Sequence, residues 1–424
     1  MKIIFNDATF SLQLLRTLGE TYYKGADIGE CLSTAYRIKE GDFESWHSEW
    51  LKTAKRIHSY ADECLAKGHT ISARDAYLRA SNYYRVSEFM LIDPQDPRIQ
   101  ITWENSKECF SKAAKLFPFT VESIDIPYEQ GITLPGYFYY TSKKSVLHNN
   151  TDGDMKNKET KIEKKSSRPT IIVHGGFDST LEELYSAAAA PALERGYNCL
   201  TFEGPGQGGV IRKQKIPFRH DWEKVVSPVI DYAVNKKIEL GIDVERIALM
   251  GISMGGYLAA RAAAFDNRIS ACILYNGVYD GYDAITSAFP KSLLNALNEG
   301  DSQYVNSTIT DLMESDPNTR FNIKHGMWTA GANSPYDLIT GVKKYTLKDI
   351  IKNITCSTLV LDAEKDDSFP GQPKKVFDAL TSPNKKYILF TQDEGAEEHC
   401  QCGAAALSNQ RIFDWIDEIF EHHK

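Results

Sequence analysis

The chain has 424 residues, of which 42% are hydrophobic and 11% aromatic, so it can bury a sizeable core and exceeds one ordinary catalytic domain. Its formal net charge of −8 argues against a nucleic-acid-binding surface. The eight cysteines lack the spacing of a disulfide framework. Neither a signal peptide nor an apolar run of membrane-spanning length is recognisable. We therefore expect a cytoplasmic protein without nucleic-acid or membrane partners.

The N-terminal part of the chain has a helical pattern. Across residues 43–65, apolar side chains recur at three- and four-residue steps, which is typical of an amphipathic helix. A second helix follows with an aromatic stripe that contains Tyr83 and Tyr84, and a third is expected near residues 104–116. Such a stripe usually packs into a core, but helices ahead of a catalytic core can also roof its active site. We therefore expect residues 1–117 to form a helical lid or dimerisation domain, in which Tyr83 or Tyr84 either packs in the core or faces substrate.

The remainder, residues 118–424, is expected to form a catalytic domain built on strands. Residues 121–126 and 132–140 indicate an opening antiparallel pair. Residues 141–168 are rich in Lys, Asn, Ser and Asp, a composition typical of a disordered insertion. Six further apolar runs complete a mainly parallel, eight-stranded sheet, at residues 169–173, 197–202, 246–250, 269–274, 356–361 and 386–390.

Ser253 lies at the apex of a sharp turn. The pentapeptide GISMG at residues 251–255 follows an apolar run and precedes a segment of helical character. Small residues two positions either side of the serine let a strand and a helix cross closely and let the serine take a strained backbone conformation. This is the pattern of the nucleophile elbow of an α/β-hydrolase, although such a pentapeptide can also be an ordinary turn. It predicts Ser253 as the nucleophile if an acid and then a histidine follow later strands.

An acid and a histidine do follow in that order. Asp366 lies just past the apolar run 356–361, where the acid of this fold usually lies, and Asp367 is the near alternative. Of the ten histidines only three follow these acids, and two of those stand beside the C-terminus, which leaves His399 as the predicted general base. The segment HCQC at residues 399–402 lacks paired CxxC spacing, so no metal is expected there.

The tetrahedral intermediate of such a nucleophilic attack needs hydrogen-bond donors for its oxyanion. The backbone amide of Met254, just after the nucleophile, is one predicted donor. The other should come from the loop after the run 169–173, where Phe177 is the candidate and Gly176 the alternative. Asp178 follows directly. It either points away from the oxyanion, is protonated, handles a proton of the substrate, or forms an Asx turn or helix cap.

Two other segments bear on the predicted cofactors and domains. The glycine-rich turn at residues 203–208 lacks the Lys-Ser/Thr ending of a phosphate-binding loop, so no nucleotide or other cofactor is expected. Residues 281–348 have helical character and several aromatic side chains. They interrupt the strand order as a second, lid-like insertion would.

Several longer motifs together resemble a known family. They are FEGPGQG at residues 202–208, GISMGG at 251–256, DWEKVV at 221–226, EHCQ at 398–401 and the helical segment SARDAYLRASNYYR at 72–85. They are similar to those of the α/β-hydrolases with an N-terminal helical domain, a group that includes the fermentation–respiration switch protein, 2,6-dihydroxypseudooxynicotine hydrolase and the fungal yellowish-green pigment hydrolases. The resemblance covers nearly the whole chain except residues 141–168. Glu203 departs from the pattern, because aspartate is usual there.

The resemblance implies an activity. Within the group the sequence is most similar to the fungal hydrolases that shorten polyketides by cleaving a carbon–carbon bond in a β-dicarbonyl side chain. It implies that Ser253, Asp366 and His399 form the catalytic triad, that the substrate is a small aromatic ketone or ester, and that a homodimer is possible. A carboxylesterase is the alternative, because the same residues would serve an ester. A non-catalytic binding protein on a hydrolase scaffold is a third hypothesis, which the complete set of triad residues disfavours.

Overall fold

The structure, a computed structural model, describes residues 1–141 and 167–421. The predicted insertion 141–168 therefore lies outside the described residues, apart from residues 141, 167 and 168. The last of these, Arg168, already belongs to a strand.

Eight strands form one sheet in the order β1-β2-β4-β3-β5-β6-β7-β8. Strand β2 pairs antiparallel with β1 and with β4, and every other neighbouring pair is parallel. The predicted α/β-hydrolase fold with a mainly parallel eight-stranded sheet is thus confirmed. The strands are β1 (Thr120–Pro127), β2 (Thr133–Tyr140), β3 (Arg168–His174), β4 (Asn198–Phe202), β5 (Ile242–Ile252), β6 (Ala271–Tyr275), β7 (Ser357–Ala363) and β8 (Lys385–Phe390).

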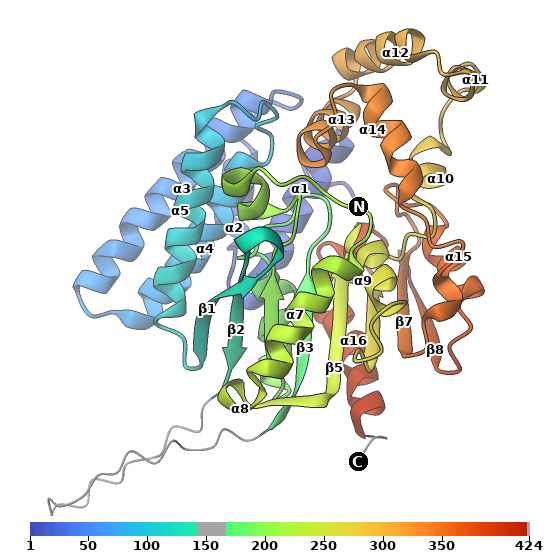
Figure 1. The fold of residues 1–424 in the computed structure, drawn as a ribbon. Helices are drawn as coiled ribbons and strands as arrows, with labels where there is room; N and C mark the ends of the chain where they lie inside the picture. The colour runs from blue at the N-terminus through green and yellow to red at the C-terminus, as the bar shows by residue number, and fades with distance from the viewer. Residues whose placement is uncertain (142–166, 422–424) are drawn as a thin grey trace, which may run out of the picture.

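The region before the sheet is helical. The helix predicted at residues 43–65 is α3, and the third helix begins earlier than predicted because Asp96 caps it and a proline occupies its first turn. These helices lie beside one face of the sheet (Figure 1) and share a continuous hydrophobic cluster with it and with the C-terminal helix. They are α1 (Ala8–Gly19), α2 (Ile28–Ala35), α3 (Phe43–Ala66), α4 (Thr70–Glu88) and α5 (Pro97–Ala114).

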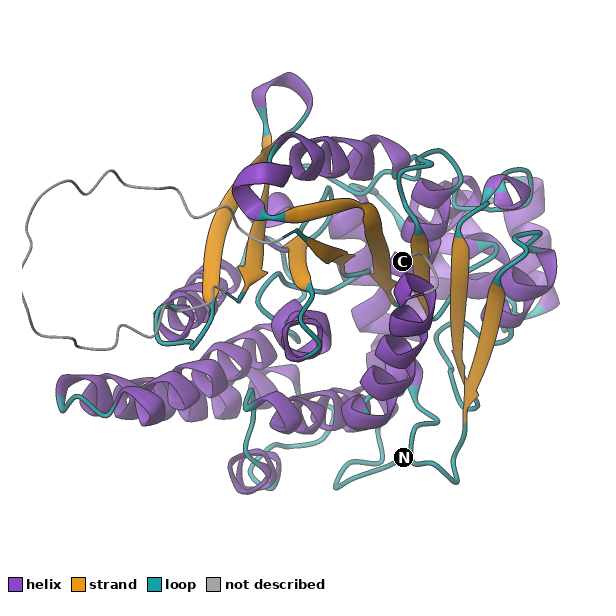
Figure 2. Cartoon of the chain, turned by 90° about the horizontal axis from the view of Figure 1, so that it is seen from below, coloured by secondary structure: helices purple, strands orange, loops and turns teal. Residues whose placement is uncertain are grey.

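Helices cover both faces of the sheet, as Figure 2 shows. A second hydrophobic cluster fills the opposite face. Because the central strands are buried on both sides, most of their inner residues are apolar. The helices that connect or follow the strands are α6 (Ala190–Glu194), α7 (Glu223–Asn235), α8 (Lys237–Leu240), α9 (Gly255–Ala263), α15 (Gln372–Ala379) and α16 (Ala405–Glu421).

The segment between β6 and β7 forms a group of helices at one end of the sheet (gold to orange in Figure 1). It has a small hydrophobic cluster of its own. The Phe321 ring of α13 stacks on the Phe89 ring, with 4.3 Å between the ring centroids. These helices are α10 (Gly281–Thr286), α11 (Lys291–Glu299), α12 (Ser302–Ser315), α13 (Pro317–Ala330) and α14 (Pro335–Gly341). Among the described residues, no helix has both the length and the apolar character needed to cross a membrane.

Candidate active site

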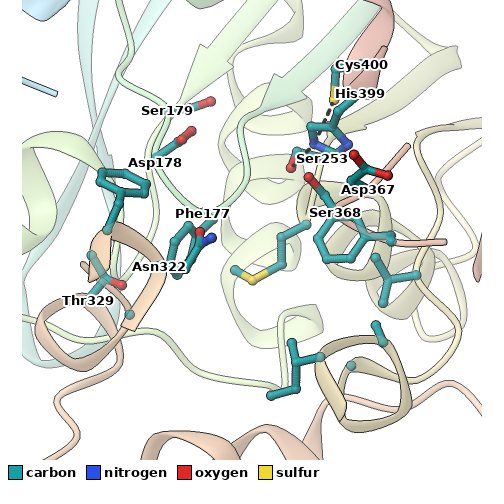
Figure 3. Close-up of a pocket in the computed structure, with 18 of the residues that line it drawn as sticks. Phe177, Asp178, Ser179, Ser253, Asn322, Thr329, Asp367, Ser368, His399 and Cys400 are labelled. Atoms are coloured by element: carbon teal, nitrogen blue, oxygen red, sulfur yellow. Dashed lines mark hydrogen bonds between the residues drawn. The ribbon is translucent and has the colours of Figure 1, made fainter. Parts of the chain in front are cut away.

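Ser253 occupies the tight turn between β5 and α9. Its backbone φ of 62° lies in the left-handed region that residues other than glycine rarely adopt. The strand and the helix cross so closely that a Cβ atom on Gly251 would lie 1.9 Å from the carbonyl oxygen of Gly255. Only glycine therefore fits at position 251, and the strained turn presents Ser253 to the cavity shown in Figure 3.

The three residues predicted as a triad are in contact. The Ser253 Oγ lies 2.8 Å from Nε2 of His399, and Nδ1 of the same ring lies 2.9 Å from Oδ1 of Asp366. Asp366 is only 5% exposed. It also accepts hydrogen bonds from the Asn276 amide (2.7 Å) and the backbone amide of Ser368 (2.8 Å). Asp367, the alternative acid, lines the cavity, but it is Asp366 that the structure places against the imidazole.

The groups around Asp366 and His399 determine the pKa values of the two side chains. Burial opposes the ionised form of Asp366, but the adjacent His399 and the backbone hydrogen bonds outweigh it and lower the pKa of the carboxyl. Burial likewise opposes the imidazolium of His399, yet the neighbouring Cys400 and Asp366 raise the pKa of the ring well above its usual value. An ionised Asp366 can only accept, so the ring in its neutral form carries its proton on Nδ1. In that form, which predominates above the raised pKa, Nε2 can accept the Ser253 proton.

The loop after β3 passes directly over the elbow. A Cβ atom on Gly176 would lie 2.6 Å from the Ile252 carbonyl oxygen and 2.8 Å from the Met254 nitrogen, so the backbones nearly touch. Within the part of the chain that the structure describes, neither the Met254 nor the Phe177 amide donates a hydrogen bond to another residue. Both residues line the same cavity as Ser253. The two amides are therefore available to an oxyanion.

The cavity has a volume of about 1150 Å³. Its lining is largely apolar, and aromatic side chains come from the loop after β3, from the N-terminal helices and from the insertion between β6 and β7. Among them are Phe89, Phe177, Phe289, Phe321 and Tyr345. Cavities of this size accommodate drug-sized molecules, and an apolar lining with few polar groups is typical of small-molecule sites.

Comparison with protein families agrees with this geometry. Residues 171–412, more than half of the chain, match the model described as "Alpha/beta hydrolase family". The chain belongs to the α/β-hydrolase family. A second model, described as "Esterase FrsA-like", matches residues 29–281 of this hydrolase.

Relatives of this α/β-hydrolase are similar over its whole length. Hydrolase LUC6 of a Fusarium species is 38% identical, over 99% of this chain and 98% of its own. The 20-hydroxy-prefusarin hydrolase FUS2 of Gibberella moniliformis is 36% identical over the same shares of the two chains. The crystal structure of 2,6-dihydroxy-pseudo-oxynicotine hydrolase has the same fold, with a TM-score of 0.71 at 21% identity over 96% of each chain. The protein is thus an enzyme of the hydrolase class, and the predicted resemblance is confirmed.

Asp178 forms an ion pair that the sequence did not predict. Its carboxylate lies 3.2 Å from Arg16 of α1, and Arg16 also binds Glu183. Burial opposes the charge on Asp178, but Arg16 more than compensates and lowers the pKa of the carboxyl. In the described structure no backbone amide donates to this carboxylate, so the expected Asx turn or helix cap is wrong. No sequence signal could have found Arg16, because it stands 162 positions from its partner in an amphipathic helix.

Tyr83 and Tyr84 do not line the cavity of this hydrolase, so the expectation that either faces substrate is wrong. The Tyr83 hydroxyl donates to Glu30 at 2.8 Å and accepts from the backbone amide of Asp27 at 2.9 Å. The Tyr84 hydroxyl lies 3.3 Å from Nδ1 of His58. The aromatic stripe belongs to the core that the helices share. The N-terminal region lines the cavity mainly through α1 and through Phe89, which follows α4.

Proposed function

We propose that this hydrolase cleaves a carbon–carbon bond in the β-dicarbonyl side chain of an aromatic polyketide by means of a Ser-His-Asp triad. The observation that carries the proposal is the unbroken contact from Ser253 through His399 to Asp366 at the wall of a large apolar cavity. The curated relative FUS2 is named as a hydrolase of 20-hydroxy-prefusarin, which supports a secondary-metabolite substrate without identifying the one used here.

The first step is attack on the ketone. His399 Nε2 takes the proton of Ser253, and Oγ adds to the carbonyl carbon of the side chain. The new oxyanion receives hydrogen bonds from the amides of Met254 and Phe177, each worth roughly 3–4 kcal/mol in comparable enzymes. Asp366 stabilises the imidazolium that forms.

The second step breaks the carbon–carbon bond. Its electron pair moves to the neighbouring carbonyl group as an enolate, and the imidazolium of His399 protonates the enolate carbon. Asp178 is unsuited to this task, because Arg16 keeps it ionised. Water, activated by the now neutral His399, then hydrolyses the acyl group from Ser253 and releases a small carboxylic acid.

A carboxylesterase is the second candidate function, and the match to the esterase-type family model favours it. The same nucleophile, base and donors would act on an ester, with an alkoxide leaving in place of an enolate. The two functions differ only in the bond that breaks, so their products distinguish them.

Product analysis by mass spectrometry tests both. The wild type and Ser253→Ala are each incubated with an acetoacetyl-substituted naphthol and, separately, with short p-nitrophenyl esters. Release of acetate or acetoacetate with a shortened aromatic product, by the wild type and not by Ser253→Ala, would establish carbon–carbon hydrolysis. Ester turnover with an intact diketone would favour the carboxylesterase. Full turnover by Ser253→Ala would show that the serine mechanism is wrong.

A further inference from the structure

The glycine-rich turn after β4 lies against the loop that follows β3, residues 175–181 (the oxyanion loop), which carries the Phe177 amide. This turn, residues 203–208, takes part in none of the steps of the proposed serine mechanism. Gln207, the fifth residue of this turn, is 2% exposed, and its side chain makes three hydrogen bonds. Its Nε2 donates to the carbonyl oxygens of Gly175 (2.8 Å) and Gly176 (3.1 Å).

The second of these carbonyls belongs to the peptide unit that carries the Phe177 amide. In a trans peptide the N–H points opposite the C=O, so a donor that holds the Gly176 oxygen also sets the direction of the Phe177 N–H. The other side of Gly176 faces the elbow, where a Cβ atom would lie 2.8 Å from the Met254 nitrogen. The peptide is therefore held between Gln207 and the backbone that carries the nucleophile.

The turn is itself anchored, so that Gln207 acts from a fixed position. Its own Oε1 accepts from the backbone amide of Gly204 at 2.9 Å. The carboxylate of Glu203 accepts from the amides of Leu181 and Gly209, each at 2.7 Å, and is 3% exposed. Leu181 lies at the far end of the oxyanion loop, so Glu203 fixes one end of that loop and Gln207 the other.

We propose that Gln207 is a positioning residue that orients the Phe177 amide for the oxyanion of the tetrahedral intermediate. The inference rests on the proposed serine mechanism and adds to it the residue that aligns one of its two donors. It does not make Gln207 a catalytic residue, because its hydrogen bonds are to the backbone and not to the substrate.

Gln207→Met tests the proposal, because methionine has a similar length and no donor. Gln372→Met is a matched control: Gln372 is 1% exposed, also makes three hydrogen bonds and does not line the cavity. We expect Gln207→Met to lower kcat about 10- to 100-fold, less than the 10²–10³-fold that follows complete loss of an oxyanion donor, with KM changed less than about threefold. A trifluoromethyl ketone, which forms an oxyanion adduct with Ser253, should lose affinity by about the same factor as kcat.

Stability and folding are measured alongside. Gln207→Met and Gln372→Met should lower the melting temperature by similar amounts, because each removes three buried side-chain hydrogen bonds. Gln372→Met should nevertheless leave kcat near the wild-type value. Should Gln207→Met not fold, Gln207→Glu takes its place, because it keeps the acceptor for the Gly204 amide and loses both donated bonds when ionised; it should also lower kcat.

A Gln207 variant that folds with wild-type kcat would overturn the inference, as would equal loss of kcat in Gln372→Met. A change in KM alone would also overturn it. These outcomes leave the serine mechanism intact when Ser253→Ala is inactive. If Ser253→Ala keeps full turnover, the proposed function is wrong and the role of Gln207 falls with it.

Discussion

Replacing Asp366 by asparagine keeps the size of the side chain and removes the charge that faces His399. The structure indicates how the amide would lie. Three donors face Oδ1, namely Nδ1 of His399 and the backbone amides of Ser368 and Phe369, whereas the Asn276 amide faces Oδ2. The asparagine oxygen should therefore remain at the Oδ1 position, and the His399 tautomer should be preserved.

The expected decrease in kcat then comes mainly from the loss of the negative charge beside His399. Unit charges about 4 Å apart attract by about 4 kcal/mol at an effective dielectric constant of about 20. This attraction is gained when the imidazolium of His399 forms in the transition state, so its loss corresponds to about a thousandfold in kcat. Asp367→Asn is the matched control, because Asp367 is the next residue along the chain and lines the cavity without bonding to His399.

The pH dependence of kcat/KM gives a second measure of the interaction between Asp366 and His399. His399 must be neutral to act as a base, so activity is lost as the pH falls through its pKa, which the structure places well above the ordinary value of 6.5. Asp366→Asn removes a cause of that increase and should move the acid limb of kcat/KM to lower pH. Steady-state rates with a p-nitrophenyl ester between about pH 5 and 9 measure both effects. Wild-type activity in Asp366→Asn, or a larger loss in Asp367→Asn, would refute the reasoning.

Two further substitutions address residues outside the triad. Arg16→Met should lower the unfolding free energy by about 2–4 kcal/mol, because Asp178 and Glu183 lose a largely buried partner. Folding lowers the pKa of Asp178, so the stability from this ion pair is present above the ordinary aspartate pKa of about 3.9 and is lost as the pH falls below it, through the lowered pKa. In urea denaturation the stability difference between Arg16→Met and wild type should therefore stay constant down to about pH 4 and narrow below it; a difference that does not narrow there would argue against the ion pair. Tyr83→Phe should lower the unfolding free energy by about 1–3 kcal/mol, because Glu30 keeps Arg79 but loses its second donor and the backbone amide of Asp27 loses its acceptor. The kcat and KM should stay unchanged; a changed KM would place Tyr83 at the substrate.

The sequence by itself determined the order of the strands along the chain and the identity of the residues at their ends. Apolar runs marked the strands because the sheet is buried on both faces, and the strained turn at Ser253 was recognisable because close crossing admits only small residues beside it. Asp366 and His399 were also found, since each follows a strand whose end lies at the same edge of the sheet.

The tertiary structure alone decided which side chains meet. It placed Asp366 rather than its neighbour against the imidazole, joined Arg16 to Asp178, buried Tyr83 among the helices and set Gln207 behind the oxyanion loop. Periodicity reports which face of an element is buried but not what covers that face. Contacts between residues tens or hundreds of positions apart depend on how layers of the fold pack, and for such polar pairs a single sequence carries no local signal.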